Sequence, residues 1–282
     1  MHEWHLRDRV LTIGCRPLVM GIVNVTPDSF SDGGRYLDHA AAIAHGLKLS
    51  ADGADILDIG GESTRPGADV VSPDEELRRV VPVVEALVKQ SATPISVDTS
   101  KAEVARRCLE AGALIVNDVT ALAGDPAMLA TAREHQAGVV LMHMRGTPRN
   151  MQQSPHYDDV MADITRFFME RSAAVTRQGI DAARIALDPG IGFGKTGPHN
   201  MEILARLSEF QRLGRPVCLG VSRKAFIGKI LERPPGERLP GSLAAVLFAQ
   251  ANKAVQIVRA HDVRETRDAV SLFAAIQERS LS

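Results

Sequence analysis

Eight short runs of apolar residues recur along the chain of 282 residues, and nearly every one ends in a polar residue that an apolar core would not select. The runs are rich in Val, Ile and Leu, and stretches of about helical length separate them. This pattern is typical of buried parallel strands in βα units. Eight such units predict an α/β fold, a (β/α)8 TIM barrel in which the carboxyl ends of the strands build the active site. The expected strands are 19–24, 56–61, 95–98, 114–118, 139–143, 185–188, 217–220 and 255–259.

The segments between the runs carry helix signals. Ser72 precedes Pro73 and Glu75, which together give an N-cap, a proline in the first turn and a capping box, and an apolar stripe follows. Ser100 and Glu103 repeat the capping box before a second apolar stripe. Weaker helical patterns cover 38–51, 125–136, 158–178, 200–212, 240–252 and 263–278.

The chain before the first run has a different pattern. Residues 9–17 hold a few strand-forming residues around Gly14, which predicts a short N-terminal plug or hairpin rather than a barrel strand. No linker, low-complexity stretch or repeat of fixed period divides the chain, so we expect residues 1–282 to form a single domain. We expect function in the long connections, because long loops at one end of a barrel usually carry it. These connections are 25–36, 60–72 and 144–157.

Composition and charge narrow the classes of function. The net charge is −1 with both signs spread along the chain, which gives no basic face for nucleic acid and no polybasic tail for a membrane surface. No apolar run approaches the length of about 18 residues that a membrane span needs, and the start carries no apolar leader. The cysteines Cys15, Cys108 and Cys218 lie far apart without metal-binding spacing, which is typical of a reducing compartment. We therefore expect a cytoplasmic protein.

Two polar loops follow the first and second runs. Asn24 ends the first run and Asp32 lies on the loop after it, so their oxygens can supply part of the shell of Mg²⁺. This ion usually takes one or two protein ligands and completes its shell with phosphate and water. Arg65 lies in a glycine-rich segment after the second run and can clamp an anion. Ordinary turn chemistry for the first loop and a structural role for Arg65 are the alternatives.

Three polar residues end strands that should surround one barrel mouth. Asp98, Asn117 and Asp188 end the third, fourth and sixth runs. A carboxylate accepts two N–H bonds and an amide both donates and accepts, so together they fit a flat heterocycle with an amidine-like edge, such as a pterin or a guanine. Each can instead cap the helix that follows it. His143 and Met144, after the fifth run, either line the face of that ring or belong to the core.

Positive charge is expected at the same mouth from the last two runs. Lys224 follows the seventh run, and Arg259 and His261 end or follow the eighth. Arg259 and His261 are candidates for binding a phosphate or a pyrophosphate. The alternative is that these cations only pair with Asp98 and Asp188.

One glycine-rich segment is misleading. Residues 190–196 are similar to a phosphate-binding P-loop, but Pro189 stands where that motif requires glycine. The Cys and His spacings predict no protein-only zinc site, and no Gly-x-Ser-x-Gly segment occurs. Covalent catalysis therefore has no obvious residue to carry it.

At these residues the chain closely resembles the dihydropteroate synthases, a family of folate-pathway enzymes. The resemblance runs from the first strand to the last, and its motifs are long and stand in a fixed order. The matching segments are NVTPDSFSDGG at 24–34, GGESTRPGA at 60–68, SVD at 96–98, NDV at 117–119, DPGIGFGKT at 188–196, SRKAFIG at 222–228 and RAHDV at 259–263.

The resemblance implies a (β/α)8 barrel, usually homodimeric, that joins 6-hydroxymethyl-7,8-dihydropterin diphosphate to 4-aminobenzoate and releases pyrophosphate. It also implies that Mg²⁺ lies near Asn24 and Asp32. An arylamine needs no strong general base, whereas the diphosphate must be separated from the pterin methylene carbon. Mg²⁺ and cationic side chains would stabilise the leaving group and Asp98 a cationic methylene, which favours a dissociative substitution.

The residues implied to act on the substrates form three groups. Those that hold the pterin and its diphosphate are Asp98, Asn117, Asp188, Lys224, Arg259 and His261. Those that close over the site and bind the aminobenzoate are Phe30, Asp32, Thr64, Arg65 and Ser222. Those expected to take part in the chemical step are Asp98, Lys224, Arg259 and Asp32.

Two alternative functions remain open at this point. A pterin-binding methyltransferase shares the barrel and the pterin-holding carboxylate and amide, but the SDGG and STRPG loops argue against it. A non-catalytic paralogue would only bind pterin, although every expected site position is intact. Ala225 stands where many relatives have a hydroxyl residue, and Ala260 where valine is common. Both departures bear on substrate affinity rather than on the reaction.

Overall fold

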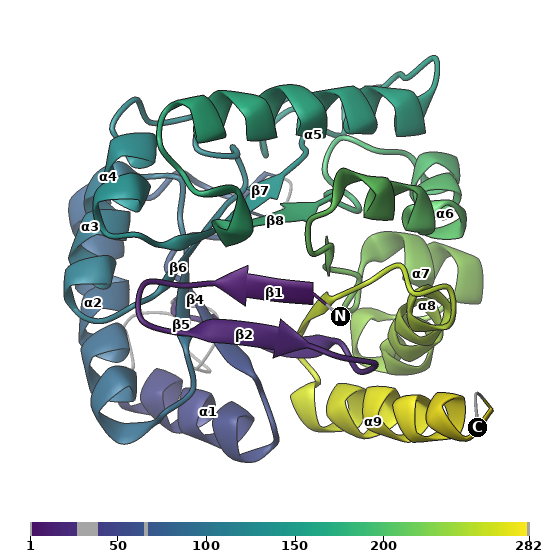
Figure 1. Cartoon of the computed structure of the whole chain (residues 1–282), viewed down its shortest axis with the longest axis horizontal. Helices are drawn as coiled ribbons and strands as arrows, with labels where there is room; N and C mark the ends of the chain where they lie inside the picture. Colours follow the sequence, from purple (N-terminus) through teal and green to yellow (C-terminus); the bar gives the residue numbers. More distant parts are fainter. Residues whose placement is uncertain (1, 27–38, 65–66, 281–282) are drawn as a thin grey trace.

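The computed structural model describes residues 2–26, 39–64 and 67–280, and its central feature is a barrel of eight parallel strands (Figure 1). The hydrogen-bonded order is β8-β7-β6-β5-β4-β3-β10-β9, and a parallel bridge between Leu187 and Val217 joins its two ends. The predicted (β/α)8 barrel is confirmed. The strands are β3 (Leu18–Asn24), β4 (Ile56–Gly60), β5 (Ile95–Asp98), β6 (Ile115–Asp118), β7 (Gly138–Met142), β8 (Ile185–Asp188), β9 (Cys218–Leu219) and β10 (Ile257–Ala260).

Each strand overlaps the apolar run that predicted it. The third and sixth runs coincide with β5 and β8, and the other runs differ from their strands by one or two residues at an end. The runs were visible because helices cover the barrel and side chains fill it, so both faces of a strand are buried. In β3, for example, every residue except the terminal Asn24 is buried.

Helices alternate with the strands and surround the barrel (Figure 1). The predicted helices are confirmed, except that 200–212 is α6 followed by a separate 3-10 helix, Leu207–Leu213. The short α7 was not predicted. The α-helices of the described ranges are α1 (His39–Ala51), α2 (Pro73–Gln90), α3 (Ala102–Glu110), α4 (Met128–Glu134), α5 (Val160–Arg177), α6 (Gly197–Ala205), α7 (Ala225–Leu231), α8 (Leu239–Ala251) and α9 (Val263–Ser280).

The capping box predicted at α3 is wrong, and of the one predicted at α2 only the N-cap is observed, because the side chain of Glu75 accepts from Arg78 and Arg79. Ser72 caps α2 as predicted, since its hydroxyl accepts from the backbone N–H of Glu75 at 3.3 Å. At α3, however, the N-cap is Lys101, which makes no side-chain capping bond. The N–H of Ala102 instead donates to the carboxylate of Asp125 at 2.8 Å. A carboxylate from a distant loop thus caps this helix, and Ser100 lies one residue too early to do so.

An antiparallel hairpin closes the amino-terminal end of the barrel. It consists of β1 (His2–His5) and β2 (Val10–Ile13), and it lies across the front of the view in Figure 1. Trp4 is fully buried against the apolar side chains inside the barrel, and its indole N–H donates to the carbonyl of Arg184 at 2.8 Å. The predicted hairpin is confirmed, although its first strand precedes the predicted segment 9–17.

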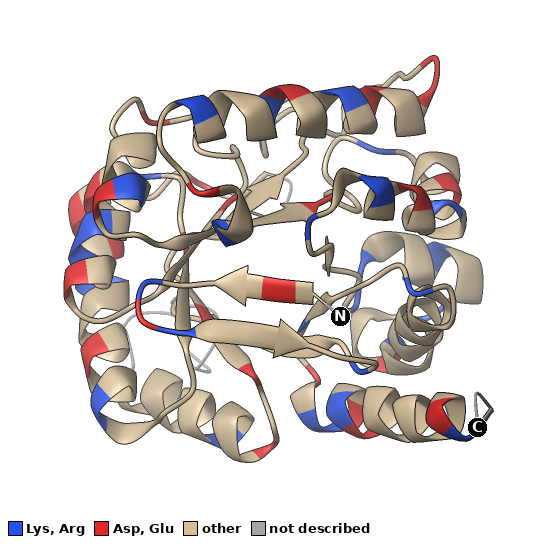
Figure 2. Cartoon of the chain, viewed as in Figure 1, with Lys and Arg blue, Asp and Glu red and all other residues tan. Residues whose placement is uncertain are grey.

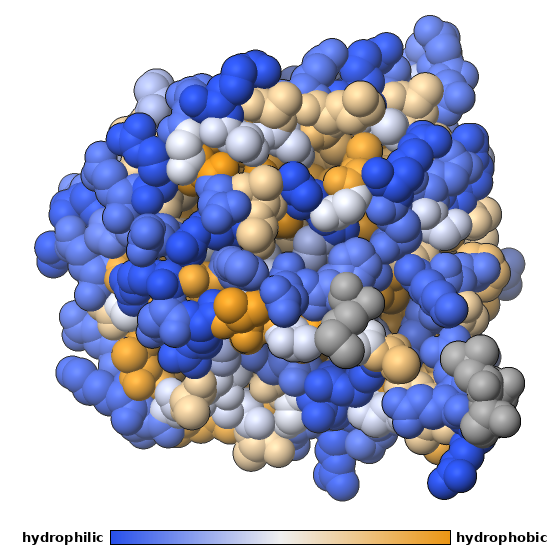
Figure 3. All heavy atoms as spheres, in the orientation of Figure 1, coloured by the Kyte–Doolittle hydropathy of each residue, from blue (hydrophilic) through white to orange (hydrophobic). Residues whose placement is uncertain are grey.

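The surface of the described residues carries mixed charge. Figure 2 shows acidic and basic residues interspersed along the outer helices. The face closed by the hairpin is mainly hydrophilic, with apolar side chains only in scattered patches (Figure 3). Among the described helices, none combines the length and the apolar character that crossing a membrane requires.

Candidate active site

The carboxyl ends of neighbouring strands bring the predicted polar residues together. In the strand register, Asn24 is paired with Gly60, Gly60 with Asp98, and Asp98 with Asn117. These positions therefore form one level across four strands, at the end of the barrel opposite the hairpin. Asp188 ends β8 on the far side of the same opening. We call the side chains that meet there the mouth cluster, and they are Asp58, Asp98, Asn117, Asp188, Lys224 and Arg259.

Arg259 links two carboxylates of the mouth cluster. It lies on β10, and its Nε donates to Oδ2 of Asp58 at 2.6 Å while one terminal nitrogen donates to Oδ2 of Asp98 at 2.7 Å. The amide nitrogen of Asn117 donates to the same oxygen of Asp58 at 3.0 Å. The side chain of Asp58 is fully buried, whereas those of Asp98 and Arg259 are 12% and 22% exposed. The expected alternative in which Arg259 pairs with Asp98 is therefore observed, and it leaves both groups at the opening.

Burial shifts the charge equilibria of these groups towards their neutral forms. Burial raises the pKa of Asp98 to about 7, although Arg259 opposes that shift, and nearby Asp58, Glu76 and Asp118 reinforce it. Burial also raises the pKa of Asp188, although the hydrogen bond from the N–H of Gly190 and the charge of Lys224 both act to lower it. Such shifts are frequent where a site must accept, hold or release charge.

The two basic groups of the mouth cluster respond differently to burial. Burial lowers the pKa of Lys224 to about 8, and the charge of Arg259 lowers it further, although the carboxylates of Asp188 and Asp98 oppose the shift. For Arg259, burial also disfavours the charged form, but the carboxylates of Asp58 and Asp98 outweigh it and raise the pKa. Arg259 is therefore a permanent cation, whereas the charge of Lys224 depends on pH near neutrality.

The connection after β8 shapes one wall of the opening. The N–H of Gly190 donates to the carboxylate of Asp188 at 2.7 Å. Gly190 has a φ of +65°, and a Cβ there would lie 2.0 Å from the carbonyl oxygen of His143, so only glycine fits. The ammonium of Lys224 lies 4.3 Å from the centre of the Phe193 ring, which holds that cation against this wall.

Lys195 is not a phosphate ligand, despite the similarity of 190–196 to a P-loop. Its ammonium contacts Nδ1 of His143 at 3.0 Å and the carbonyls of His143 and Phe193 at 3.2 and 3.0 Å, and the residue is only 2% exposed. Burial lowers the pKa of Lys195 to about 7. Lys195 thus ties the connection after β8 to the end of β7.

His143 is nearly buried at the end of β7, packed against aromatic side chains, and it also lines a groove beside α5. It is 7% exposed and makes an edge-to-face contact with Phe167, with 5.0 Å between the ring centres. Burial, reinforced by Lys195, lowers the pKa of His143 to about 3, so the ring is neutral. Met144 lines the same groove, together with Arg145 and Tyr157.

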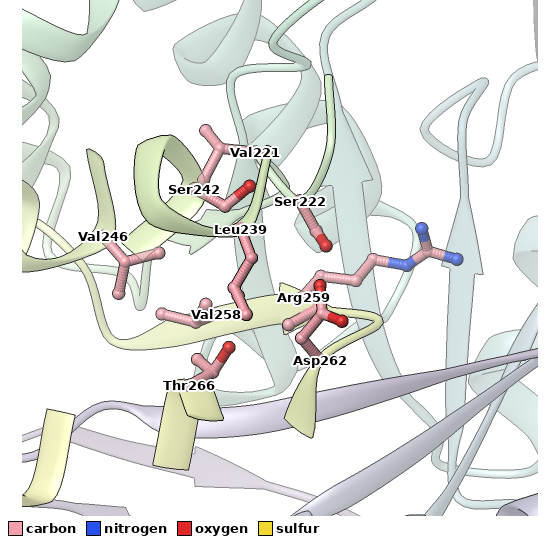
Figure 4. Close-up of a pocket in the computed structure, with 10 residues that line it drawn as sticks. Val221, Ser222, Leu239, Ser242, Val246, Val258, Arg259, Asp262 and Thr266 are labelled. Atoms are coloured by element: carbon pink, nitrogen blue, oxygen red, sulfur yellow. The ribbon is translucent and has the colours of Figure 1, made fainter. Parts of the chain in front are cut away.

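The end of β9 and the end of β10 are joined by Ser222 and His261. The hydroxyl of Ser222 lies 3.0 Å from Nδ1 of His261 and accepts from the backbone N–H of His261 at 3.2 Å. Ser222 and Arg259 line a small cavity beside α8, and the guanidinium of Arg259 extends away from the other lining residues (Figure 4). Arg223, between Ser222 and Lys224, instead pairs with Asp262 at 3.0 Å.

For the remaining predicted site residues, the structure gives a position and a degree of burial only for Asn24 and Thr64. Asn24 is partly buried at the end of β3, and Thr64 is partly buried on the connection after β4. Phe30, Asp32 and Arg65 lie outside the described residues. In the described ranges, His, Cys, Asp and Glu side chains form no cluster of three or more that is suited to a metal ion.

Two features of the site were missed in the sequence. Asp58 stands inside the second apolar run, where an acidic residue is itself an unusual signal. Lys101 pairs with Glu62 at 2.7 Å and also with Glu76, whose side chain is fully buried in α2. The second oxygen of Glu62 accepts from the N–H of Val71 at 2.9 Å, so this carboxylate joins both ends of the connection that carries Thr64.

Comparison with known proteins agrees with this geometry. A family model described as pterin binding enzyme matches residues 20–261. A dihydropteroate synthase of Escherichia coli (strain K12) is 49% identical over 259 residues, which is 92% of this chain and 91% of that protein. The structure of Yersinia pestis dihydropteroate synthase with a sulfonamide drug complex has a TM-score of 0.92 at 45% identity and covers 98% of this chain and 99% of that one. Xanthomonas albilineans dihydropteroate synthase with 4-aminobenzoic acid has a TM-score of 0.91 at 50% identity, with 98% of each chain covered.

Proposed function

The chain belongs to the dihydropteroate synthase family of pterin-binding enzymes, and on that basis we propose how its barrel mouth performs the reaction. The enzyme is a transferase that condenses 6-hydroxymethyl-7,8-dihydropterin diphosphate with 4-aminobenzoate and releases pyrophosphate. The observation that carries the assignment of the site is the mouth cluster. In this cluster, carboxylates and an amide that can bind a heterocycle lie beside a permanent positive charge that can bind a diphosphate.

The pterin ring lies between β5, β6 and β8. Asp188 accepts two N–H bonds from the amidine-like edge of the ring, and Asn117 presents the amide atoms that Asp58 leaves free. Lys224 approaches the ring from the wall formed by Phe193. Asp98 faces the methylene carbon, where its negative charge stabilises the cation that develops as the leaving group departs.

The diphosphate lies towards β10 and β3. Arg259 and His261 supply positive charge and N–H donors to its oxygens. Asn24 offers a single oxygen at the end of β3, which fits an ion that is held mainly by diphosphate and water rather than by a protein cluster. When bound, Mg²⁺ would neutralise charge on the pyrophosphate leaving group. Asp32, on the loop after β3, is the second proposed ligand.

The aminobenzoate enters from the side of Ser222. In this dissociative substitution, the C–O bond to the diphosphate breaks first, and the free lone pair of the amine then forms the C–N bond to the methylene cation. The amine proton passes to water or to the released pyrophosphate, so no strong base is needed. Ser222 is held by His261 at the edge of the opening. We assign Phe30, Thr64 and Arg65 to the enclosure of this substrate, which excludes water that would otherwise trap the cation.

Three broader features complete the proposal. Residues 1–282 act as one domain, because the hairpin packs into the end of the barrel. The free cysteines of the described chain fit the reducing environment of the cytoplasm. The protein is a homodimer through α7, α8 and α9, whose exposed apolar side chains need a cover. These side chains are Ile230, Leu231, Phe248, Leu272 and Ile276.

The direct test is to mix the purified protein with pterin diphosphate, 4-aminobenzoate and Mg²⁺ and to measure dihydropteroate and pyrophosphate. We expect both products in equal amounts. Pterin binding without either product would instead support a non-catalytic paralogue, and methyl transfer from a pterin to a corrinoid would support a methyltransferase.

A further inference from the structure

Asp58 is an ionisable residue inside the barrel that none of the substrate roles above requires. It lies in the middle of β4, between Leu57 and Ile59, which belong to the apolar core. Its side chain is fully buried, and one oxygen, Oδ2, receives both Arg259 at 2.6 Å and Asn117 at 3.0 Å. The other oxygen, Oδ1, is buried and has no donor among the residues that the structure describes.

A carboxylate in this position is a poor choice for stability alone. Burying a charged group is costly, and apolar side chains of similar volume often serve a core as well or better than a buried ion pair. The arrangement of Asp58 leaves one oxygen unsatisfied, which adds to that cost. Residues that violate local packing rules in this way are expected at functional sites.

The two ends of the Arg259 guanidinium are held unequally. Its Nε contacts Asp58, which is fully buried, whereas a terminal nitrogen contacts Asp98, which is partly exposed at the opening. Asp98 is also a proposed substrate contact. A ligand that reaches Asp98 therefore competes with Arg259 for it, while no ligand can reach the contact between Arg259 and Asp58.

We propose that Asp58 is a positioning residue, a fixed anchor that holds Arg259 and orients the amide of Asn117 while Asp98 is released to the substrate. The inference rests on the proposed function of the mouth cluster. With Nε anchored, Arg259 gives up its contact with Asp98 without leaving the site. With one amide N–H engaged by Asp58, Asn117 is fixed in one of its two amide orientations.

The opposite behaviour is expected when the charge of Asp58 is removed. In Asp58→Asn, the neutral amide oxygen holds Arg259 more weakly than the carboxylate does, and the guanidinium turns towards Asp98, with which it can form two parallel hydrogen bonds. Asp98 is then less available to the pterin, and the amide of Asn117 loses a charged partner. Affinity for the pterin ring should therefore fall, although Asp58 itself does not touch the ligand.

A role as a simple counter-charge predicts a different result. If Asp58 only neutralised Arg259, its removal would increase the positive potential at the opening. Pyrophosphate would then bind more tightly to Asp58→Asn, and affinity for the uncharged pterin alcohol would not change.

The experiment is a double-mutant cycle measured by calorimetry with 6-hydroxymethyl-7,8-dihydropterin. The proteins are the wild type, Asp58→Asn, Arg259→Ala and the double variant. We expect Asp58→Asn to weaken binding roughly tenfold in the wild type and by a clearly smaller factor in Arg259→Ala, because coupled residues are non-additive. A second cycle, with Asn117→Ala in place of Arg259→Ala, tests the contact between Asp58 and Asn117 in the same way.

Asp55→Asn is the matched control. Asp55 lies just before β4, at the opposite end of the barrel, where it pairs with Arg16 at 2.8 Å and Arg267 at 3.0 Å. The substitution Asp55→Asn also removes one negative charge from an ion pair with arginine. Because this pair lies at the far end of the barrel, we expect the pterin affinity to stay unchanged. Thermal unfolding of each variant shows whether the protein remains folded during the titrations.

The outcomes separate this inference from the proposed function. The anchor is supported if the wild type binds the pterin and Asp58→Asn binds it more weakly. The loss of affinity must also be smaller when Asp58→Asn is introduced into Arg259→Ala or Asn117→Ala. Equal penalties in all backgrounds, unchanged pterin affinity, or tighter pyrophosphate binding alone would overturn it. Failure of the wild type to bind the pterin would instead count against the proposed function.

Discussion

At the scale of single residues, burial decides which groups of the mouth cluster carry charge near neutral pH. Arg259 stays charged because two carboxylates contact it, whereas Asp98 has its pKa raised by burial to about 7 and Lys224 has its pKa lowered by burial to about 8. We therefore expect ligand binding at the opening to change the protonation of Asp98 and Lys224. Asp188 differs from Asp98 because a backbone N–H of Gly190 holds one of its oxygens in place.

Asp188→Asn should weaken pterin binding severely. An amide cannot accept both ring N–H bonds, and the loss of a charged hydrogen bond costs about 1.5–3 kcal/mol. Calorimetric titration with the pterin alcohol measures the effect. Asp181→Asn is a suitable control, because Asp181 only caps a short helix before β8 and asparagine caps equally well. Unchanged affinity in Asp188→Asn would remove this residue from the pocket.

Pterin affinity should depend on pH through Asp98. The pKa of Asp98 is raised to about 7, so its carboxyl is mainly protonated at about pH 6 and mainly ionised at about pH 8. Only the ionised form presents a negative charge and two acceptor oxygens to the pterin beside its methylene carbon, so affinity rises with pH, roughly tenfold over this interval for a single group. Above about pH 8, loss of the Lys224 proton works in the opposite direction. A wild-type profile that is flat below about pH 8, as we expect for Asp98→Asn, would contradict this assignment.

At the scale of elements, the connection after β4 is held to two helices through one partly buried cation, Lys101. Lys101 pairs with Glu62, which joins both ends of that connection, and with Glu76 inside α2. Burial alone would lower the pKa of Lys101, but the two carboxylates outweigh burial and raise it, so the lysine remains charged. The ion pairs thereby link the connection that carries Thr64 to α2 and α3.

Lys101→Met should destabilise the protein by about 3–5 kcal/mol, because it leaves the carboxylate of Glu76 buried without a partner. Urea unfolding followed by circular dichroism measures the loss. Lys48→Met is the matched control, since Lys48 pairs with Asp52 on the exposed surface of α1, where such pairs contribute about 0.3–0.5 kcal/mol. Equal losses in the free energy of unfolding for the two variants would show that the ion pairs of Lys101 with Glu62 and Glu76 do not stabilise the fold more than a surface pair does.

The sequence predicted those parts of the fold and site that leave a local signal. A strand buried on both faces gives a continuous apolar run, and a polar residue that ends the run, such as Asn117, stands out against it. Asp58 was itself an unusual acidic residue in an apolar run, but its partner could not be found in the sequence, because Arg259 is 201 residues away and only the closed barrel brings them together. The prediction of the α3 cap was wrong for a similar reason, because the group that caps this helix, Asp125, lies on the connection after β6.

At the scale of the whole molecule, one side of the barrel is more apolar than a solvent-exposed surface requires. The helix α8 contains no charged residue, a pattern that is typical of a helix buried on all sides. Its Phe248 is nevertheless 50% exposed. Helices α7 and α9 both contact α8, and they add Ile230 and Ile276, which are 57% and 58% exposed. We infer that the exposed side chains of these three neighbouring helices make up the face that a second copy of the chain covers in the proposed dimer.

Phe248→Asp should convert the proposed dimer to a monomer. A charge placed at the centre of an apolar interface loses its water without gaining a partner, which we expect to raise the dimer dissociation constant by a factor of about 100 or more. Sedimentation velocity over a range of concentrations measures the change. Met169→Asp provides the control, because Met169 is 60% exposed on α5, away from the α7–α9 face (Figure 1), and should leave the dimer intact. A wild type that sediments as a monomer at all concentrations would rule out the dimer. A Phe248→Asp variant that stays dimeric would place the interface elsewhere. Because the barrel mouth is built from one chain, the monomeric variant should still bind the pterin alcohol, which separates assembly from substrate recognition.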